Sequence, residues 1–157
     1  NIYAPYGTYD GGREKAPAAL CRKVLTAKKN NDNKIQVWGD GKQTRTFLYI
    51  DDCVEGTLRL FESDYSDPVN IGSDEQVSIN QMIDIIEKIS GIEKLDREYQ
   101  LDKPKGVRGR SSNNEFVKNV LNWSYGIKLK DGLTKTYNWI DSESSKEGSN
   151  LSRFIKS

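Results

Sequence analysis

Charged side chains gather around the predicted start of a helix near the beginning of the chain. Residues 11–23 read GGREKAPAALCRK and place Lys15 two residues ahead of Pro17, with Arg22 and Lys23 further along. Proline is favoured in the first turn of a helix, where its missing N–H costs nothing. The exposed N–H groups of that turn and the nearby cations suit an anion such as phosphate. A solvated, lysine-rich helix end is the alternative that charge alone favours.

A second polar run, WGDGKQTRTFLYIDD, occupies residues 38–52. Its Gly39-Asp40-Gly41 predicts a turn that tolerates positive φ. The strand that follows would present alternate side chains to a cleft, and an arginine there can form charge-assisted hydrogen bonds with phosphate. Gln43, Thr44 and Arg45 are therefore ligand-binding candidates, with an exposed edge strand as the alternative.

A third cationic segment, Gly106-Val107-Arg108-Gly109-Arg110, lies in a predicted loop. Its glycines allow the backbone to approach a ligand closely. Arg110 is the stronger candidate, although Arg108 is equally basic. An RNA-binding Arg-Gly patch is disfavoured, because the motif occurs once and no aromatic platform lies beside it.

Composition excludes several classes of protein. The 157 residues suffice for one domain with a core, and the net charge of +1 argues against a general nucleic-acid or membrane surface. No apolar stretch approaches the ~20 residues of a membrane helix, and the first residues do not read as a signal peptide, so we expect a cytoplasmic protein. The chain has no histidine and only Cys21 and Cys53, which argues against a metal site and predicts buried free thiols.

Alternating strands and helices predict an α/β fold. Helical periodicity and end signals predict helices over 17–29, 52–61, 79–90, 113–121 and 131–142. Asp52 with Glu55, and Ser78 with Gln81, read as capping boxes, and Gly91 as a helix stop. The predicted strands cover 35–38, 44–50, 69–71 and 95–101. Residues 146–157 read as a polar tail, in which Leu151, Phe154 and Ile155 could dock.

Several of these motifs, in this order, resemble the nucleotide-sugar epimerases and dehydratases of the extended short-chain dehydrogenase family. Asn1-Ile2-Tyr3-Ala4-Pro5-Tyr6-Gly7 is similar to that family's Asn-x-Tyr-Gly-Pro segment, Pro68-Val69-Asn70-Ile71-Gly72 to its late strand, and Leu121-Asn122-Trp123 to its Leu-Gly-Trp. Residues 11–19 and 106–110 resemble one branch in particular, the GDP-mannose 3,5-epimerases. Ala4, Asn122 and Tyr125 depart from the family pattern.

The resemblance implies that residues 1–145 are the C-terminal, nucleotide-sugar-binding part of a Rossmann-type enzyme. The family's glycine turn for the dinucleotide does not follow any strand here, so NAD would be bound mainly by a missing N-terminal half, and this chain alone would be inactive. The full-length enzyme would act on a nucleotide sugar, GDP-mannose in the branch most resembled, and would form a homodimer.

The resemblance also implies roles for individual residues. Lys15 would be the catalytic acid or base, which exchanges a proton once NAD has oxidised C4 and made the C3 and C5 protons acidic. Substrate contacts carried over from the family are Asn1, Glu14, Lys15, Ala16, Lys23, Gln43, Thr44, Arg45 and Arg110. From the residues alone, a turn, a helix-dipole and a surface role stay open for Asn1, Glu14 and Lys23 respectively.

Two alternatives remain at this stage. The chain could belong to another NAD-dependent enzyme of the family, a 4-epimerase, a 4,6-dehydratase or a decarboxylase. It could also be a non-catalytic nucleotide-sugar-binding module. Tyr3, Trp38, Phe47 and Tyr49 could stack on a base, although core packing is the default expectation for each aromatic residue.

Overall fold

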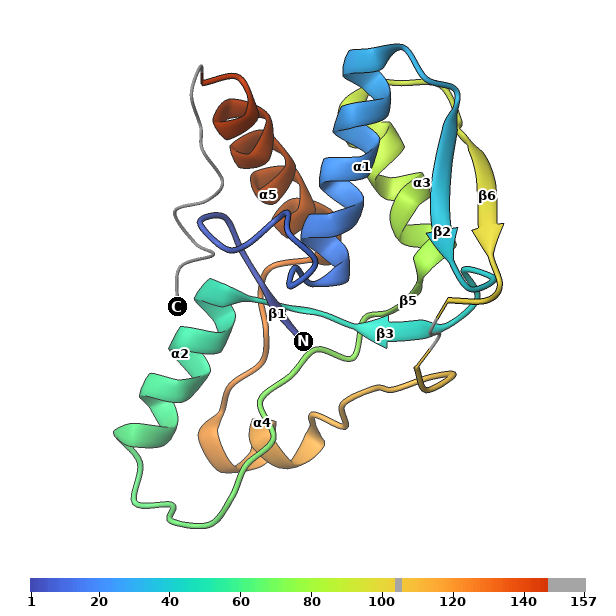
Figure 1. The fold of residues 1–157 in the computed structure, drawn as a ribbon. Coiled ribbons are helices and arrows are strands. Elements are labelled where there is room, and N and C mark those ends of the chain that lie inside the picture. Colours follow the sequence, from blue (N-terminus) through green and yellow to red (C-terminus); the bar gives the residue numbers. More distant parts are fainter. Residues whose placement is uncertain (104–105, 147–157) are drawn as a thin grey trace.

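Three helices form the centre of the fold (Figure 1): α1 (Ala16–Asn30), α3 (Ile79–Ser90) and α5 (Leu129–Ser144). The computed structural model describes residues 1–103 and 106–146. Each helix contacts the other two, and Val24, Ile83 and Leu133 are fully buried in the main core between them. These helices confirm the predictions made from helical periodicity, although α5 begins two residues earlier than expected.

The strands form three short pairs around this centre, which confirms the predicted α/β class. β2 (Lys34–Trp38) pairs in parallel with β6 (Asp96–Gln100), and β3 (Thr44–Thr46) pairs antiparallel with β5 (Gln76–Ser78). β1 (Ile2–Tyr3) pairs in parallel with β4 (Leu48–Tyr49). The turn between β2 and β3 has positive φ at Gly39 and Gly41, as predicted.

Two further helices lie below the central bundle in Figure 1, α2 (Ile50–Phe61) and α4 (Glu115–Leu121). They share a second, smaller core whose buried residues are Leu48, Val117, Leu121 and Trp123. β4 therefore connects the two cores, because Leu48 belongs to the smaller one and Tyr49 to the main one.

The ends of α3 form as their residues predict. The Ser78 hydroxyl accepts a hydrogen bond from the Gln81 N–H at 3.1 Å, and the Gln81 side chain accepts one from the Ser78 N–H at 2.8 Å. Gly91 ends the helix in the left-handed conformation with φ 70°. This helix fixes the end of β5 beside the turn that follows β2.

Three expectations about the middle of the chain are wrong. The single strand predicted over 44–50 is divided, because β3 pairs with β5 whereas β4 turns to pair with β1. Residues 69–71 form no strand, since Val69 and Ile71 pack half-buried against the smaller core without a partner strand among the described residues.

The expected capping role of Asp52 is the third error. α2 starts at Ile50, so Asp52 lies inside its first turn and no side-chain cap forms. Its buried carboxylate instead accepts hydrogen bonds from the Gly126 and Ile127 N–H groups at 2.9 and 3.0 Å. Asp52 therefore anchors the segment that leads into α5.

Cys21 and Cys53 are free thiols; Cys21 is buried as expected, whereas Cys53 is only half-buried. Leu151, Phe154 and Ile155 lie outside the described residues, as does the predicted tail from residue 147 onward. Among the described helices, none is both long and apolar enough to cross a membrane.

Candidate functional site

A pocket of about 640 Å³ opens between the N-terminal half of α1 and the β2–β3 turn. The residues 11–23 run and the second polar run, which are distant in sequence, both line it. The pocket residues come from the loop before α1, from α1 and β2, and from the start of β3 and α3: Asp10, Gly11, Gly12, Glu14, Ala16, Ala19, Leu20, Arg22, Lys23, Gln36, Val37, Trp38, Gln43 and Ile79. Four of the residues predicted to bind substrate are therefore in its wall: Glu14, Ala16, Lys23 and Gln43.

Glu14 organises the loop that forms one wall of this pocket. Its carboxylate accepts a hydrogen bond from the Gly12 N–H at 2.7 Å and another from Arg22 at 3.3 Å. Arg22 also donates to the Tyr9 carbonyl and lies 3.4 Å from Asp10. Both oxygens of Glu14 are engaged, and the charge of Arg22 is offset by two carboxylates.

The cation that remains available to a ligand in the pocket is Lys23. Its Nζ donates to the Gln36 carbonyl at 2.9 Å and lies 6.0 Å from the centre of the Trp38 ring. Partial burial, and then the neighbouring Arg22 charge, lower the pKa of the Lys23 ammonium. An anionic ligand beside Lys23 would favour its charged form and oppose that shift.

Trp38 is the aromatic residue of the four considered that could stack on a ligand. It is 54% exposed at the end of β2, whereas Tyr3, Phe47 and Tyr49 are at most 7% exposed and belong to the core. Core packing was the expectation for all four, and it is wrong for Trp38. The alternation of β2 was the available signal, because Ile35 and Val37 are buried and place Trp38 on the opposite face.

Gln43 joins the turn to this wall of the pocket. Its Nε2 donates to the Trp38 carbonyl at 3.2 Å. Its Oε1 is buried and has no hydrogen-bond partner within the described part of the chain. An unsatisfied buried acceptor costs about 1–3 kcal/mol, so a donor from a ligand or from water would stabilise this side chain.

The arginine-rich loop lies along β3 and extends its small sheet. The Thr44 N–H donates to the Arg108 carbonyl at 3.0 Å, and the Arg110 N–H donates to the Thr44 carbonyl at 3.3 Å. Gly109 thus forms a parallel bridge with Thr44, on the opposite edge of β3 from β5. The structure brings together two segments that the sequence separates by more than sixty residues.

Side-chain alternation divides the candidates on β3 between two faces. The Thr44 hydroxyl accepts a hydrogen bond from the Gln76 amide at 2.8 Å, on the face that Gly109 also presents. Arg45 lies on the other face, and Gln43, two residues before it, points to the same side. Arg108 and Arg110 flank Gly109 and share that face with Arg45. Thr44 is therefore placed away from the cationic face.

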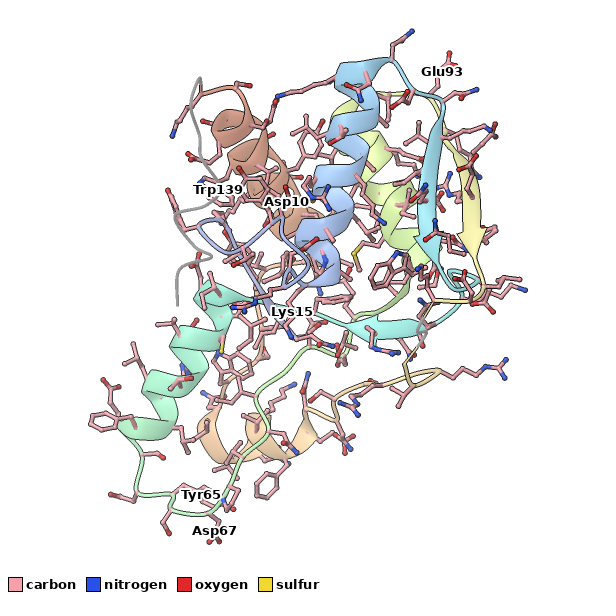
Figure 2. The ribbon with its side chains drawn as sticks, viewed as in Figure 1. Asp10, Lys15, Tyr65, Asp67, Glu93 and Trp139 are labelled. Carbon is pink, nitrogen blue, oxygen red and sulfur yellow. The ribbon has the colours of Figure 1, made fainter. Side chains whose placement is uncertain are left out.

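Lys15 and Asn1 lie outside the pocket wall. Lys15 is the exposed N-cap residue of α1, and its carbonyl accepts the Ala19 N–H at 3.0 Å. Figure 2 shows it at the end of α1 that faces β3 and α2, with Asp10 in the preceding loop. Asn1 is exposed and donates from its side chain to the Thr46 carbonyl at 3.2 Å. Lys15 is exposed to water in this chain, whereas a catalytic lysine is typically buried.

Comparison with known proteins relates this arrangement to one family. The family of NAD-dependent epimerases and dehydratases matches residues 1–72. GDP-mannose 3,5-epimerase 1 from Oryza sativa subsp. japonica is 52% identical over 150 residues, which are 94% of this chain and 37% of the rice protein. GDP-mannose 3,5-epimerase from Arabidopsis thaliana is 49% identical over 157 residues, 98% of this chain and 40% of that protein.

Among solved structures, UDP-glucose 4-epimerase from Thermotoga maritima, determined with UDP-glucose, has a TM-score of 0.80 and 25% identity. The match spans 92% of this chain and 45% of the Thermotoga protein. The chain therefore spans about two fifths of the length of the relatives that it matches.

Proposed function

Because this chain belongs to the NAD-dependent epimerase/dehydratase family, we propose that it is the substrate-binding part of a GDP-mannose 3,5-epimerase. One observation carries the proposal: about half of the residues are identical to two plant enzymes of that name over nearly the whole chain. The pocket supports the proposal, because residues 11–19, which resemble this branch, contribute Gly11, Gly12, Glu14, Ala16 and Ala19 to its lining.

The described residues do not fit an NAD site. Among the described residues, no strand is followed by the family's Gly-x-x-Gly-x-x-Gly turn, which receives a dinucleotide diphosphate at the start of a helix; the loop between β1 and α1 has Gly7, Gly11 and Gly12, which do not have that spacing. The parallel strands that contact α2, β1 and β4, have two residues each. Binding of NAD is therefore proposed for the remainder of a longer enzyme, and this chain alone is proposed to be inactive. In the intact enzyme, NAD would supply reversible oxidation at C4 of the sugar.

Lys15 is proposed to move protons in that reaction. A ketone at C4 acidifies the C–H bonds at C3 and C5, so a neutral Nζ can remove a proton and leave an enolate. Return of a proton to the opposite face of that carbon inverts the centre. The exposed position of Lys15 at the end of α1 allows a sugar to reach it, and a second acid or base from the remainder of the enzyme would complete the exchange.

The nucleotide is proposed to occupy the pocket beside α1. Trp38 offers an exposed aromatic face for the base. Lys23 is adjacent and can approach the diphosphate, while the first turn of α1, whose Ala16 lines the pocket, contributes a favourable dipole. Glu14 is proposed to act by holding the Gly11-Gly12 loop, because both of its oxygens already have partners.

Arg45 and Arg110 are proposed as the second clamp on the diphosphate. They share one face of the extended β3 sheet, and guanidinium groups form paired, charge-assisted hydrogen bonds with phosphate oxygens. Arg108 lies on the same face and is the alternative to Arg110. Asn1 is proposed to contact the sugar from the end of β1. Thr44 is proposed to act by holding the arginine-rich loop through its backbone N–H and carbonyl, since its hydroxyl is engaged by Gln76.

The assembly and location of the enzyme are also proposals. We propose a homodimer whose interface lies in the remainder of the protein, as the family resemblance implies. The free thiols of Cys21 and Cys53 agree with a reducing compartment, and we propose a cytoplasmic location.

Nucleotide preference tests this assignment against another enzyme of the family. The longer protein should bind GDP-mannose more tightly than UDP-glucose by at least tenfold in calorimetric titration. Equal affinities, or a preference for UDP-glucose, would favour a different nucleotide-sugar epimerase, dehydratase or decarboxylase. Tight binding without turnover of either compound would favour the non-catalytic module.

A further inference from the structure

The first turn of α3 is bonded to the turn between β2 and β3. Ile79 and Asn80 are the first two residues of α3, and the N–H groups at the start of a helix have no acceptor within the helix itself. The Ile79 N–H donates to the Gln43 carbonyl at 3.3 Å, and the Asn80 N–H donates to the Gly41 carbonyl at 3.0 Å. The β2–β3 turn therefore supplies the acceptors for this end of α3, next to the Ser78 hydroxyl that satisfies the third N–H group.

Asn80 adds a side-chain bond to the same turn. Its Nδ2 donates to the Asp40 carbonyl at 3.4 Å. Tyr99 donates to the Asn80 Oδ1 at 3.3 Å from the exposed side, and loss of that contact would leave both bonds between Asn80 and the turn in place. Asn80 thus holds two successive carbonyls of the turn, one through its side chain and one through its backbone.

The turn and the start of α3 are closely fitted to each other. Gly39 and Gly41 have positive φ values of 75° and 68°, and both are buried although they lie in a turn. A Cβ atom on Gly41 would lie 2.3 Å from the Asn80 Oδ1, which is closer than a van der Waals contact. Glycine at position 41 is therefore what allows the Asn80 side chain to approach the turn.

The same turn places two residues of the pocket. Trp38 and Gln43 stand at its two ends and both line the pocket, and the Gln43 Nε2 donates across the turn to the Trp38 carbonyl. Asn80 is not among the described residues that line the pocket, although its neighbour Ile79 is. A change in the turn would thus displace the Trp38 ring and the Gln43 amide without altering any other wall of the pocket.

We propose that Asn80 is a positioning residue for the nucleotide, because it holds the β2–β3 turn in the shape that presents Trp38 and Gln43 to the pocket. The inference rests on the proposed placement of the nucleotide beside α1. A ligand that requires this shape binds with an affinity reduced by the fraction of molecules that have it. Asn80 therefore sets the affinity without contact to the ligand.

The substitution Asn80→Asp separates this role from a structural one. The two side chains have nearly the same shape, but aspartate has no donor for the Asp40 carbonyl, and a carboxylate oxygen would lie against it. A carboxylate in the first turn of a helix interacts favourably with the dipole, which offsets the lost hydrogen bond, so the urea midpoint should stay close to wild type. If about one molecule in ten keeps the turn in place, the affinity falls about tenfold.

Gln81→Glu is the matched control at the next position of the same helix. It introduces the same charge and retains an oxygen that can accept the Ser78 N–H. The hydrogen bonds of Gln81 in the described structure are those of the capping box, so the turn should be unaffected. This variant should bind GDP-mannose like wild type, and it accounts for repulsion between an added negative charge and the diphosphate.

Both variants are made in the longer protein and measured in two ways. Calorimetric titration with GDP-mannose should show the roughly tenfold loss of affinity in Asn80→Asp alone, with turnover at saturating substrate within about twofold of wild type. Hydrogen exchange in the absence of ligand, followed by mass spectrometry, should be at least about fivefold faster over residues 39–43 in Asn80→Asp and unchanged in Gln81→Glu.

The outcomes distinguish the inference from the proposed function. Wild-type affinity in Asn80→Asp, or an equal loss in Gln81→Glu, would overturn the positioning role. Unchanged exchange over residues 39–43 would show that the turn does not depend on Asn80. A wild-type protein that does not bind GDP-mannose would contradict the proposed function instead, and the exchange measurement would still decide whether Asn80 holds the turn.

Discussion

Replacing Trp38 with alanine should separate ligand binding from folding. Trp38 is 54% exposed, so less than half of its side chain is buried by the fold. Full truncation of a buried aromatic residue costs about 3–5 kcal/mol, and in proportion Trp38→Ala should lower the free energy of unfolding by only about 1–2 kcal/mol. Stacking of a nucleic-acid base on an aromatic side chain contributes about 1–3 kcal/mol. The affinity for GDP-mannose should therefore fall by about 5- to 150-fold.

Tyr99 provides the control for this substitution. It lies on the adjacent strand β6, is 46% exposed and does not line the pocket. Tyr99→Ala should therefore have a similar effect on unfolding by urea and none on affinity. Calorimetric titration of the longer protein with GDP-mannose measures the second quantity. An affinity unchanged by Trp38→Ala, or lowered equally by Tyr99→Ala, would refute the placement of the base against Trp38.

Four other predictions concern chemistry, clamping and stability. Lys15→Ala in the longer protein should lower turnover of GDP-mannose by about 10²- to 10⁴-fold, the usual contribution of a positioned acid or base, with little change in affinity; intact turnover would remove Lys15 from the mechanism. Arg110→Ala should weaken GDP-mannose binding by about 1–3 kcal/mol, and an effect seen only with Arg108→Ala would transfer the clamp to that residue. Asp52→Asn retains one acceptor for two backbone N–H groups whose hydrogen bonds are part-buried, so it should cost about 1–3 kcal/mol in urea unfolding, whereas a stability equal to wild type would contradict its anchoring role. Burial raises the pKa of the Cys21 thiol to about 12, so below that pH it stays protonated, and a thiol reagent at pH 8 should label Cys53 and spare Cys21 until the chain unfolds; equal labelling rates would contradict that burial.

The helices and their ends could be predicted because their signals are local. Pro17 at the start of α1, and Ser78, Gln81 and Gly91 around α3, act through neighbours within a few residues. The backbone groups that they satisfy lie in the same turn. α2 was predicted from the same kind of signal but with the wrong first turn, because Asp52 forms its hydrogen bonds with a segment more than seventy residues away.

The strands were harder to predict because pairing is a long-range property. The run over 44–50 reads as one strand by composition, and only the competing partners β5 and β1 divide it at Phe47. Val69 and Ile71 are apolar enough for a strand but find side-chain contacts without a neighbouring backbone to pair with. Val54, Leu58 and Phe61 of α2 recur at helical spacing, which is typical of a buried face, yet they are 49%, 53% and 86% exposed within the described residues.

The site was anticipated in part. The sequence marked both runs that line the pocket, together with the loop that lies along β3. It could not show that Arg22 is paired with Asp10 and Glu14, or that the Thr44 hydroxyl faces Gln76, since each depends on which face of an element meets which neighbour.

Proton exchange at the sugar tests the central proposal most directly. The longer protein, with its cofactor-binding part present, would be incubated with GDP-mannose in deuterated water and the sugar followed by proton NMR. The proposal predicts loss of the proton signals at both C3 and C5, because each centre passes through an enolate that takes up deuterium. Retention of both signals, in a preparation shown to bind GDP-mannose, would contradict 3,5-epimerisation of this substrate.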